Sequence, residues 1–201
     1  MIKVVIFDFD DTLYSGMDKR PWTNYCKKAI KALLCPYVNE AYIQTFIKQA
    51  DFSDKNMIGL LRKFGKTEQD WFEYKKTHKV VGDAYKNCKV VSNEVLKDFA
   101  KHFKLYIVSN STKEAVLKNC EKLNINISLF TDILTNAYQD NQCTKAHIYE
   151  QIIKKENILP EALFVIGNSF HSDVQPALQL GAKGQVVTEA DFVFSDFLFE
   201  S

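Results

Sequence analysis

The sequence predicts an α/β protein with a doubly wound parallel sheet and a small α-helical domain inserted into it. Two observations carry this prediction. From about residue 89 onwards, short apolar stretches alternate with helical patterns, which is typical of a parallel sheet with helices on both faces. The segment from about residue 15 to 88 instead holds helix formers and aromatic residues, and it contains no convincing strand.

The first element is a strand over residues 2–9. Its apolar side chains follow one another without alternation, as in a strand that is buried on both faces of its sheet. Three acids, Asp8, Asp10 and Asp11, stand within four residues at the end of this strand. Because neighbouring like charges repel one another and resist burial, this cluster requires a functional explanation.

Several short helices are expected after this strand. Their patterns read NYCKKAIKALL, EAYIQTFIKQADF, MIGLLRKF and EQDWFEYKKTHKVV. A helical module placed directly after the first strand suggests a cap over the strand's carboxyl end, where open α/β sheets bind ligands. We therefore divide the chain into an α/β core, residues 1–15 and 88–201, and a helical cap domain, residues 16–87.

The remaining elements follow in order along the chain. Clear strands are expected at residues 105–108 and 163–166, weaker ones at 132–134 and 185–187, and helices at 111–123, 146–155 and 174–180. Ser111 is followed three residues later by Glu114, a capping-box pattern. This pattern predicts that the first of these helices is opened by Ser111.

Composition excludes several classes of protein. The chain has 26 Lys and Arg against 25 Asp and Glu, so no basic excess indicates a nucleic-acid partner. Five widely spaced cysteines without a CxxC pair favour neither a disulfide framework nor a zinc site. No signal peptide or membrane span is apparent, since the first apolar run breaks at Asp8. We expect a cytoplasmic protein with reduced thiols, no membrane partner, and a monomeric or homodimeric state.

Four short stretches contain the candidate catalytic and binding residues. They are Asp8-Phe9-Asp10-Asp11-Thr12, Val108-Ser109-Asn110, Thr144-Lys145-Ala146 and the loop Gly167–Asp173, GNSFHSD. Taken singly, each has an ordinary structural interpretation: a turn with a helix cap, a capping serine, a surface lysine and a polar loop. Taken together, they bring carboxylates, a hydroxyl, a lysine and an amide to one edge of the sheet.

This arrangement resembles the haloacid dehalogenase-like superfamily of phosphohydrolases. Asp8, Asp10 and Thr12 match its first motif, hhhhDxDxT, and Ser109, Lys145 and the Gly167–Asp173 loop match the second, third and fourth. The resemblance covers the whole chain, including a helical cap between motifs one and two. It implies a Rossmann-like core and an Mg²⁺-dependent phosphatase acting on a small phosphorylated metabolite.

The chemistry of phosphate esters assigns the catalytic roles. The ester dianion repels nucleophiles, so an enzyme must neutralise charge and hold the attacking atom in line. A carboxylate ionised at neutral pH can attack phosphorus, and we expect Asp8 to do so and form an aspartyl-phosphate. Asp10 would protonate the leaving alkoxide and later activate water. Lys145 would supply positive charge to the phosphate and to Asp8.

The same motifs supply substrate contacts and metal ligands. Thr12, Ser109, Asn110 and Lys145 are expected to bind the phosphoryl oxygens or to fix the loops around them. Oxygen donors favour Mg²⁺. By resemblance, its ligands are the Asp8 carboxylate, the Asp10 backbone carbonyl, Asn168 and Asp173.

Asn168 departs from the family pattern. Relatives often have Gly-Asp at the start of motif four, where this chain has Gly167-Asn168. Asp8, Asp10 and Asp173 carry −3, which Mg²⁺ and Lys145 offset, whereas an Asp at 168 would leave −1. The hypothesis is weaker metal binding with less repulsion of an incoming phosphate.

Other polar and aromatic residues receive simpler expectations. Asp11 is expected to accept backbone N–H groups in the turn, and His171 to lie on the surface of its loop. Asp140 is a further polar candidate, and Lys55 lies near the expected mouth of the cap. Tyr14, Arg20 and Trp22 are candidates for lining the substrate cavity, whereas Trp71, Phe72 and Tyr74 are assigned to packing.

Three alternatives remain open. A haloacid dehalogenase would share the Asp8 nucleophile but would need neither Mg²⁺ nor an acid at position 10, because a halide leaves without a proton. A phosphomutase would hold its phosphoenzyme long enough to return the phosphate. A weakly active or non-catalytic binding protein is kept open by Asn168.

Overall fold

A parallel sheet of five strands forms the centre of the molecule. The computed structural model describes residues 1–34, 38–49, 52–78, 80, 84–138 and 144–197. The strand order is β5-β4-β1-β6-β7, with bounds β1 Val4–Phe7, β4 Lys104–Ser109, β5 Asp132–Thr135, β6 Leu163–Gly167 and β7 Lys183–Val186. The sequence predicted all five strands, and the α/β class is confirmed.

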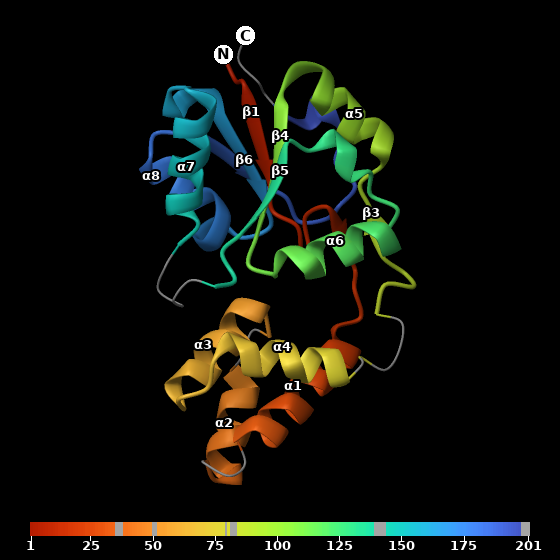
Figure 1. Cartoon of the computed structure of the whole chain (residues 1–201). Helices are drawn as coiled ribbons and strands as arrows, with labels where there is room; N and C mark the ends of the chain where they lie inside the picture. Colours follow the sequence, from red (N-terminus) through yellow and green to blue (C-terminus); the bar gives the residue numbers. More distant parts are fainter. Residues whose placement is uncertain (35–37, 50–51, 79, 81–83, 139–143, 198–201) are drawn as a thin grey trace.

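The central strand β1 is buried because helices cover both faces of the sheet (Figure 1). Val5 and Phe7 pack in the cluster that contains α5 (Asn93–His102) and α6 (Lys113–Lys122). Val4 and Ile6 pack in the opposite cluster with α7 (Ala146–Glu156) and α8 (Gln175–Gln179). Successive residues of a strand point to opposite faces, so an unbroken apolar run is what this position requires.

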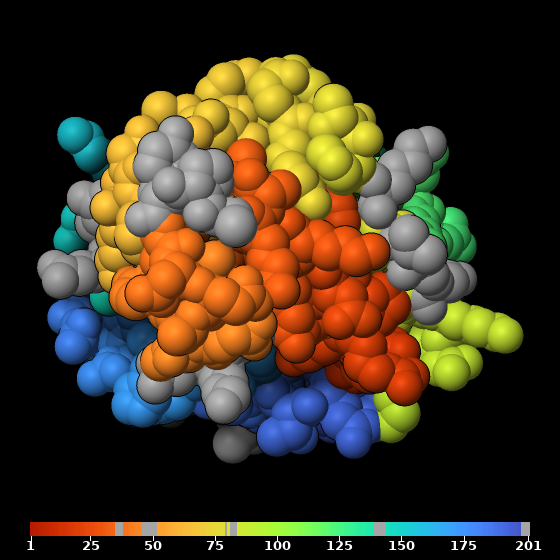
Figure 2. All heavy atoms as spheres, turned by 90° about the horizontal axis from the view of Figure 1, so that it is seen from below, coloured from red at the N-terminus to blue at the C-terminus, as the bar shows by residue number. Residues whose placement is uncertain are grey.

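The predicted helical insert is present and has an apolar core of its own. Its helices are α1 Lys19–Leu34, α2 Glu40–Gln49, α3 Asp54–Lys63 and α4 Glu68–Thr77. Trp71 and Tyr74 are buried in this core and Phe72 packs against it, as expected for packing residues. The insert lies beyond the carboxyl ends of the strands (Figure 1), and from that side it covers much of the molecule (Figure 2).

A small second sheet was not predicted. β2 (Tyr14–Ser15) and β3 (Lys89–Val90) pair antiparallel, with Tyr14 opposite Val90. These two-residue strands lie where the chain leaves the core and where it returns. Strands this short carry no alternation for a sequence pattern to show.

Helix α6 begins differently from the prediction. The residue that caps it is Thr112, whose side chain accepts the Ala115 N–H, and Ser111 lies outside the helix. The capping-box prediction at Ser111 was therefore wrong by one residue. The helix predicted at 174–180 also starts earlier, as a π-helical turn, Phe170–Val174, that leads into α8. Three short 3₁₀ helices complete the described elements: Ile127–Leu129, Pro160–Ala162 and Phe194–Asp196.

Two expectations concern the cysteines and the absence of a membrane-spanning helix. Cys26, Cys88 and Cys120 are not in disulfides, while Cys35 and Cys143 lie outside the described part of the chain. None of the described helices combines the length and the apolar character that crossing a bilayer requires.

Candidate active site

Three of the four motifs meet at the carboxyl edge of the sheet. Asp8 follows β1 directly, and its backbone N–H donates to the Ile166 carbonyl at 2.8 Å. Ser109 is the last residue of β4, and Asn168 follows the last residue of β6. Because β4, β1 and β6 are neighbours in the sheet, strand order alone places these residues side by side.

Lys145 brings the third motif to the same place. Its ammonium Nζ donates to Asp8 Oδ1 at 2.6 Å and to Asp173 Oδ1 at 2.7 Å, and all three residues are buried. Burial alone would lower the pKa of Lys145, but the charges of the two carboxylates outweigh burial and raise it. The lysine therefore stays protonated between two acids that no other described lysine or arginine contacts.

Burial perturbs the carboxyl group of Asp8. Burial raises the pKa of Asp8 to about 7. The charge of Lys145 acts against this rise, and the charges of Asp173 and Asp10 add to it. Thr12 is fully buried and donates its hydroxyl to Asp8 Oδ2 at 3.2 Å. Both oxygens of Asp8 thus have a donor, and the carboxylate is held in one orientation.

Asp10 is held by a separate set of hydroxyl groups. The Tyr14 hydroxyl donates to Oδ1 at 2.5 Å and the Ser111 hydroxyl to Oδ2 at 2.8 Å, with Ser109 at 3.5 Å from Oδ2. Partial burial raises the pKa of Asp10, while the bonds from Tyr14 and Ser111 act in the opposite direction. Asp8 contacts an ammonium and Asp10 only hydroxyls, so the two acids differ in electrostatic environment.

Sequence reasoning missed the role of Ser111 and misplaced Tyr14. Tyr14 is only 1% exposed and points at Asp10, so it does not line an open cavity as expected. Ser111 follows Ser109 by two residues, and the only available signal was its place in the polar Ser109–Thr112 turn. The same pattern predicts a helix cap, which the structure assigns to Thr112.

The loop after β4 is fixed by its own side chains. The Ser109 hydroxyl accepts the Ser111 N–H at 2.9 Å, and Asn110 Oδ1 accepts the Asn136 amide at 3.1 Å. Asn110 remains half-buried at the edge of the sheet.

Motif four is shaped around Asp173. Asp173 Oδ2 accepts the Ser169 N–H at 2.9 Å, and Oδ1 accepts the Ser172 hydroxyl at 3.2 Å in addition to Lys145. A Cβ on Gly167 would lie 2.5 Å from the Asp173 Cβ, so only glycine fits at that position. The π-helical turn that carries Asp173 is a distortion often found at functional sites.

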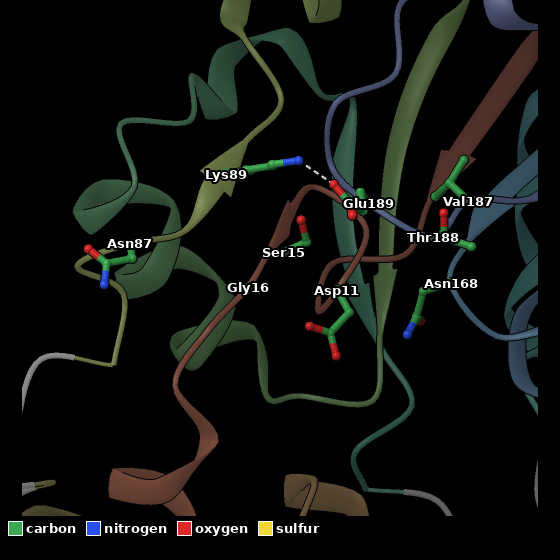
Figure 3. A pocket seen from close by; sticks show the side chains of 9 residues that line it. All are labelled: Asp11, Ser15, Gly16, Asn87, Lys89, Asn168, Val187, Thr188 and Glu189. Carbon is green, nitrogen blue, oxygen red and sulfur yellow. Dashed lines mark hydrogen bonds and ion pairs between the residues drawn. The ribbon is translucent and has the colours of Figure 1, made fainter.

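A cleft of about 540 Å³ lies beside these motifs, between the loop after β1, the β2–β3 sheet and the chain after β7 (Figure 3). Asn168, which is exposed, and Asp11 line it, together with the ion pair of Lys89 and Glu189. Asn168 is the member of motif four that faces this cleft.

Several secondary expectations need correction. Asp11 has a left-handed φ of 57°, and its carboxylate pairs with Lys19 at 2.7 Å rather than with turn N–H groups. Neither Arg20 nor Trp22 lines the cleft: Arg20 is exposed and pairs with Asp18, while Trp22 packs with the insert core. His171 is exposed in its loop, as predicted. Lys55 is buried, and Asp140 lies outside the described residues.

The donor set at the edge fits a hard divalent cation. Among the described residues, no three His, Cys, Asp or Glu side chains form a metal cluster, so a cation here needs amide or carbonyl oxygens as well. Such oxygens are available beside the Asp8 and Asp173 carboxylates, and all-oxygen sets suit Mg²⁺. Among the described residues, the carboxyl groups of Asp8 and Asp173 share one ammonium, that of Lys145, and Asp10 lies close enough to Asp8 to raise its pKa.

Comparisons with known proteins agree with this geometry. The model of a hydrolase family, the haloacid dehalogenase-like hydrolases, matches residues 2–181. Solved structures with the same fold include a predicted phosphoglycolate phosphatase from Haemophilus somnus (17% identity, TM-score 0.61, 97% of this chain and 90% of that one). A putative haloacid dehalogenase-like hydrolase from Bacteroides fragilis is similar too (18% identity, TM-score 0.63, 98% and 92%).

A third solved structure was determined with ligands. It is a HAD-family enzyme from Bacteroides thetaiotaomicron, a mutant in complex with magnesium and inorganic phosphate (13% identity, TM-score 0.55, 98% of this chain and 100% of that one). No curated protein sequence matches the chain. The family model nevertheless covers most of the chain, and its motif residues lie together at the carboxyl edge of the sheet. The protein therefore belongs to the haloacid dehalogenase-like hydrolase family.

Proposed function

We propose that the protein is an Mg²⁺-dependent phosphatase that hydrolyses a small phosphorylated metabolite through an aspartyl-phosphate. The observation that carries the proposal is the pair of acids after β1. Asp8 is buried against an ammonium, and Asp10, two residues away, is held by hydroxyls. A nucleophile and a separate proton carrier are what hydrolysis of a phosphate ester requires.

In the first step an Asp8 oxygen attacks phosphorus. The bond between phosphorus and the leaving oxygen breaks, and Asp10 gives its proton to that oxygen. Lys145 offsets the charge of the phosphoryl group and keeps Asp8 oriented. Burial raises the pKa of Asp10, which is the direction that a proton donor requires.

In the second step a water molecule attacks the phosphorus of the aspartyl-phosphate. Asp10, now ionised, takes a proton from the water. The bond between phosphorus and Asp8 breaks, which releases inorganic phosphate and restores the carboxylate. Tyr14 and Ser111 hold Asp10 through both steps, since each donates to a different oxygen of its carboxylate.

The candidate metal ligands are Asp8, the backbone carbonyl of Asp10, Asn168 and Asp173. When bound, Mg²⁺ would supply positive charge to the phosphoryl oxygens and lower the pKa of Asp8. Thr12, Ser109, Asn110 and Lys145 remain our candidates for phosphate contacts or for fixing the loops that make them. Thr12 and Ser109 support the second role, because both already bond within the site.

The insert is proposed to act as a cap domain spanning residues 16–87. Its position over the carboxyl edge would exclude bulk water from the site (Figure 2).

Phosphate release from p-nitrophenyl phosphate tests this proposal. The wild-type protein should release p-nitrophenol in the presence of Mg²⁺ and lose this activity with EDTA. Asp8→Asn should be inactive. Asp10→Asn should retain some transfer to Asp8 but turn over slowly, because general acid–base help is typically worth about 10²–10⁴ in rate.

Other outcomes would favour the alternatives. Activity without Mg²⁺, or activity that survives Asp8→Asn, would refute the mechanism. Release of halide from a 2-haloacid would support a dehalogenase instead. No turnover of any phosphate ester by the wild-type protein would favour a non-catalytic binding role.

A further inference from the structure

A buried acid of the insert reaches across to the core. Asp54, the first residue of α3, is 3% exposed. Within the insert its Oδ1 accepts the Trp71 indole N–H at 2.8 Å and the Lys75 ammonium at 3.0 Å. Its Oδ2 accepts the backbone N–H of Thr112, a core residue, at 3.2 Å. One carboxylate therefore joins two helices of the insert to the start of α6.

The Thr112 end of this contact lies beside Asp10, the proposed acid–base residue. Thr112 directly follows Ser111, whose hydroxyl donates to Asp10. Ser111 is also tied back to Ser109 through its own N–H. The turn from Ser109 to Thr112 is thus held at one end by the sheet and at the other by Asp54, and the group that holds Asp10 lies between them.

Two other contacts between insert and core, both at Tyr138, lie away from this turn. Arg62 donates to the Tyr138 carbonyl at 3.1 Å, and the rings of Phe72 and Tyr138 meet edge to face. Both contacts are partly exposed. Asp54 differs in that it is buried and bonds to the turn itself.

We propose that Asp54 is a positioning residue that couples the seating of the insert to the orientation of Asp10. With the insert seated, Asp54 fixes the Thr112 N–H and thereby Ser111. When the insert moves away, the turn loses this anchor and Asp10 loses a fixed partner. Proton transfer is then efficient only while the insert covers the site. This inference rests on the proposed role of Asp10 in a phosphatase.

Asp54→Asn is the direct test. Trp71, Lys75 and Thr112 all donate to Asp54, and an amide offers one acceptor oxygen where the carboxylate offers two. The measurement is kcat/KM for two esters of similar shape, phenyl phosphate and p-nitrophenyl phosphate. Phenolate is the poorer leaving group and needs a proton from Asp10 more. We expect a loss of about tenfold to a hundredfold for phenyl phosphate and less than about threefold for p-nitrophenyl phosphate.

If the role of Asp54 is only structural, the losses of kcat/KM for the two esters should follow a different pattern. If Asp54 only supports folding, both esters lose activity by the same factor, and that result would overturn the proposal. Arg62→Gln is the matched control, because it weakens the same interface without touching the turn. It should affect both esters equally. In an Asp10→Asn background, Asp54→Asn should cause no further loss, since the two substitutions then act on one function.

Variants on the core side test the same contact if Asp54→Asn folds poorly. Thr112 has φ −68°, which proline accepts. Thr112→Pro and Thr112→Ala both lose the capping hydroxyl, but only the proline loses the N–H that Asp54 binds. The proline variant should reproduce the dependence on the leaving group, and the alanine variant should not. Equal behaviour of the two would overturn the proposal.

Hydrogen exchange separates this inference from the proposed function. If the wild-type protein hydrolyses neither ester, the proposed function fails, and the Thr112 amide still reports on the contact. Its exchange should be slow in the wild-type protein and at least about tenfold faster in Asp54→Asn, with the Arg62→Gln variant unchanged. Equal exchange in all three proteins would overturn the contact itself.

Discussion

The three acids after the first strand are chemically identical in the sequence but not in the structure. Asp8 faces an ammonium, Asp10 faces only hydroxyl groups, and Asp11 pairs with Lys19 near the surface. Burial raises the pKa of Asp8 to about 7. Lys145 and Ser111, which come from distant parts of the chain, help to create this difference, so spacing alone could not assign all three roles.

The first prediction at the scale of single residues concerns Lys145. Lys145→Met would leave Asp8 and Asp173 buried without their shared cation. Breaking a buried ion pair from one side typically costs about 3–5 kcal/mol, and we expect a loss of this size in urea unfolding with EDTA present. Adding Asp173→Asn should recover part of the stability without restoring phosphatase activity. A single variant as stable as wild type would show that the cluster is not held by charge.

The second prediction at this scale concerns Asn168. Asn168→Asp adds a carboxylate beside the proposed Mg²⁺ ligands, so the Mg²⁺ concentration for half-maximal activity should fall. Inhibition by inorganic phosphate should weaken at the same time, because the added charge repels the anion. Mg²⁺ titrations of activity in both proteins decide the matter. Unchanged or weaker apparent metal affinity in the variant would remove Asn168 from the ligand set.

At the scale of elements, the turn that follows β6 is built to hold one side chain. The loop is longer than a tight turn, and its π-helical geometry lets Asp173 fold back against Gly167 and accept the Ser169 N–H. Neither the π turn nor the close approach leaves a pattern in the sequence. The strands that deliver Asp8, Ser109 and Asn168 were predictable because their apolar runs are strong, and strand order then placed the motifs.

Gly167→Ala tests that packing. The added Cβ would lie 2.5 Å from the Asp173 Cβ, so Asp173 must shift and its bond to Lys145 must lengthen. We expect at least about a tenfold fall in kcat, in line with the cost of misplacing a catalytic group. Gly184→Ala is the matched control, since its Cβ would meet Val165 and Val174 but no motif residue. It should cost stability and leave kcat of the folded protein nearly unchanged.

The whole molecule contains apolar clusters in two places, on the sheet and inside the insert. The existence of a helical insert was predictable from helix formers and aromatic residues in residues 16–87. How it meets the core was not, because contacts such as Asp54 with Thr112 join residues far apart in sequence and follow no period. The small sheet that pairs Tyr14 with Val90 was not predictable for the same reason, because it joins residues far apart in sequence.

These separate clusters make a prediction about unfolding. Both tryptophans, Trp22 and Trp71, belong to the insert core, so tryptophan fluorescence reports on the insert while circular dichroism reports on the whole chain. Leu61 is fully buried in the insert core, and Leu61→Ala should cost about 2–5 kcal/mol there. The fluorescence transition in urea should then precede the main dichroism transition.

Ile107→Ala, in the sheet core, is the matched substitution and should give the opposite pattern. An insert of this size is only marginally stable alone, so loss of the sheet core should carry the insert with it. Both transitions should therefore move together to lower urea concentration. If the two probes coincide in Leu61→Ala as well, insert and core unfold as one cooperative unit, and the contacts around Asp54 must couple them more tightly than two separate clusters imply.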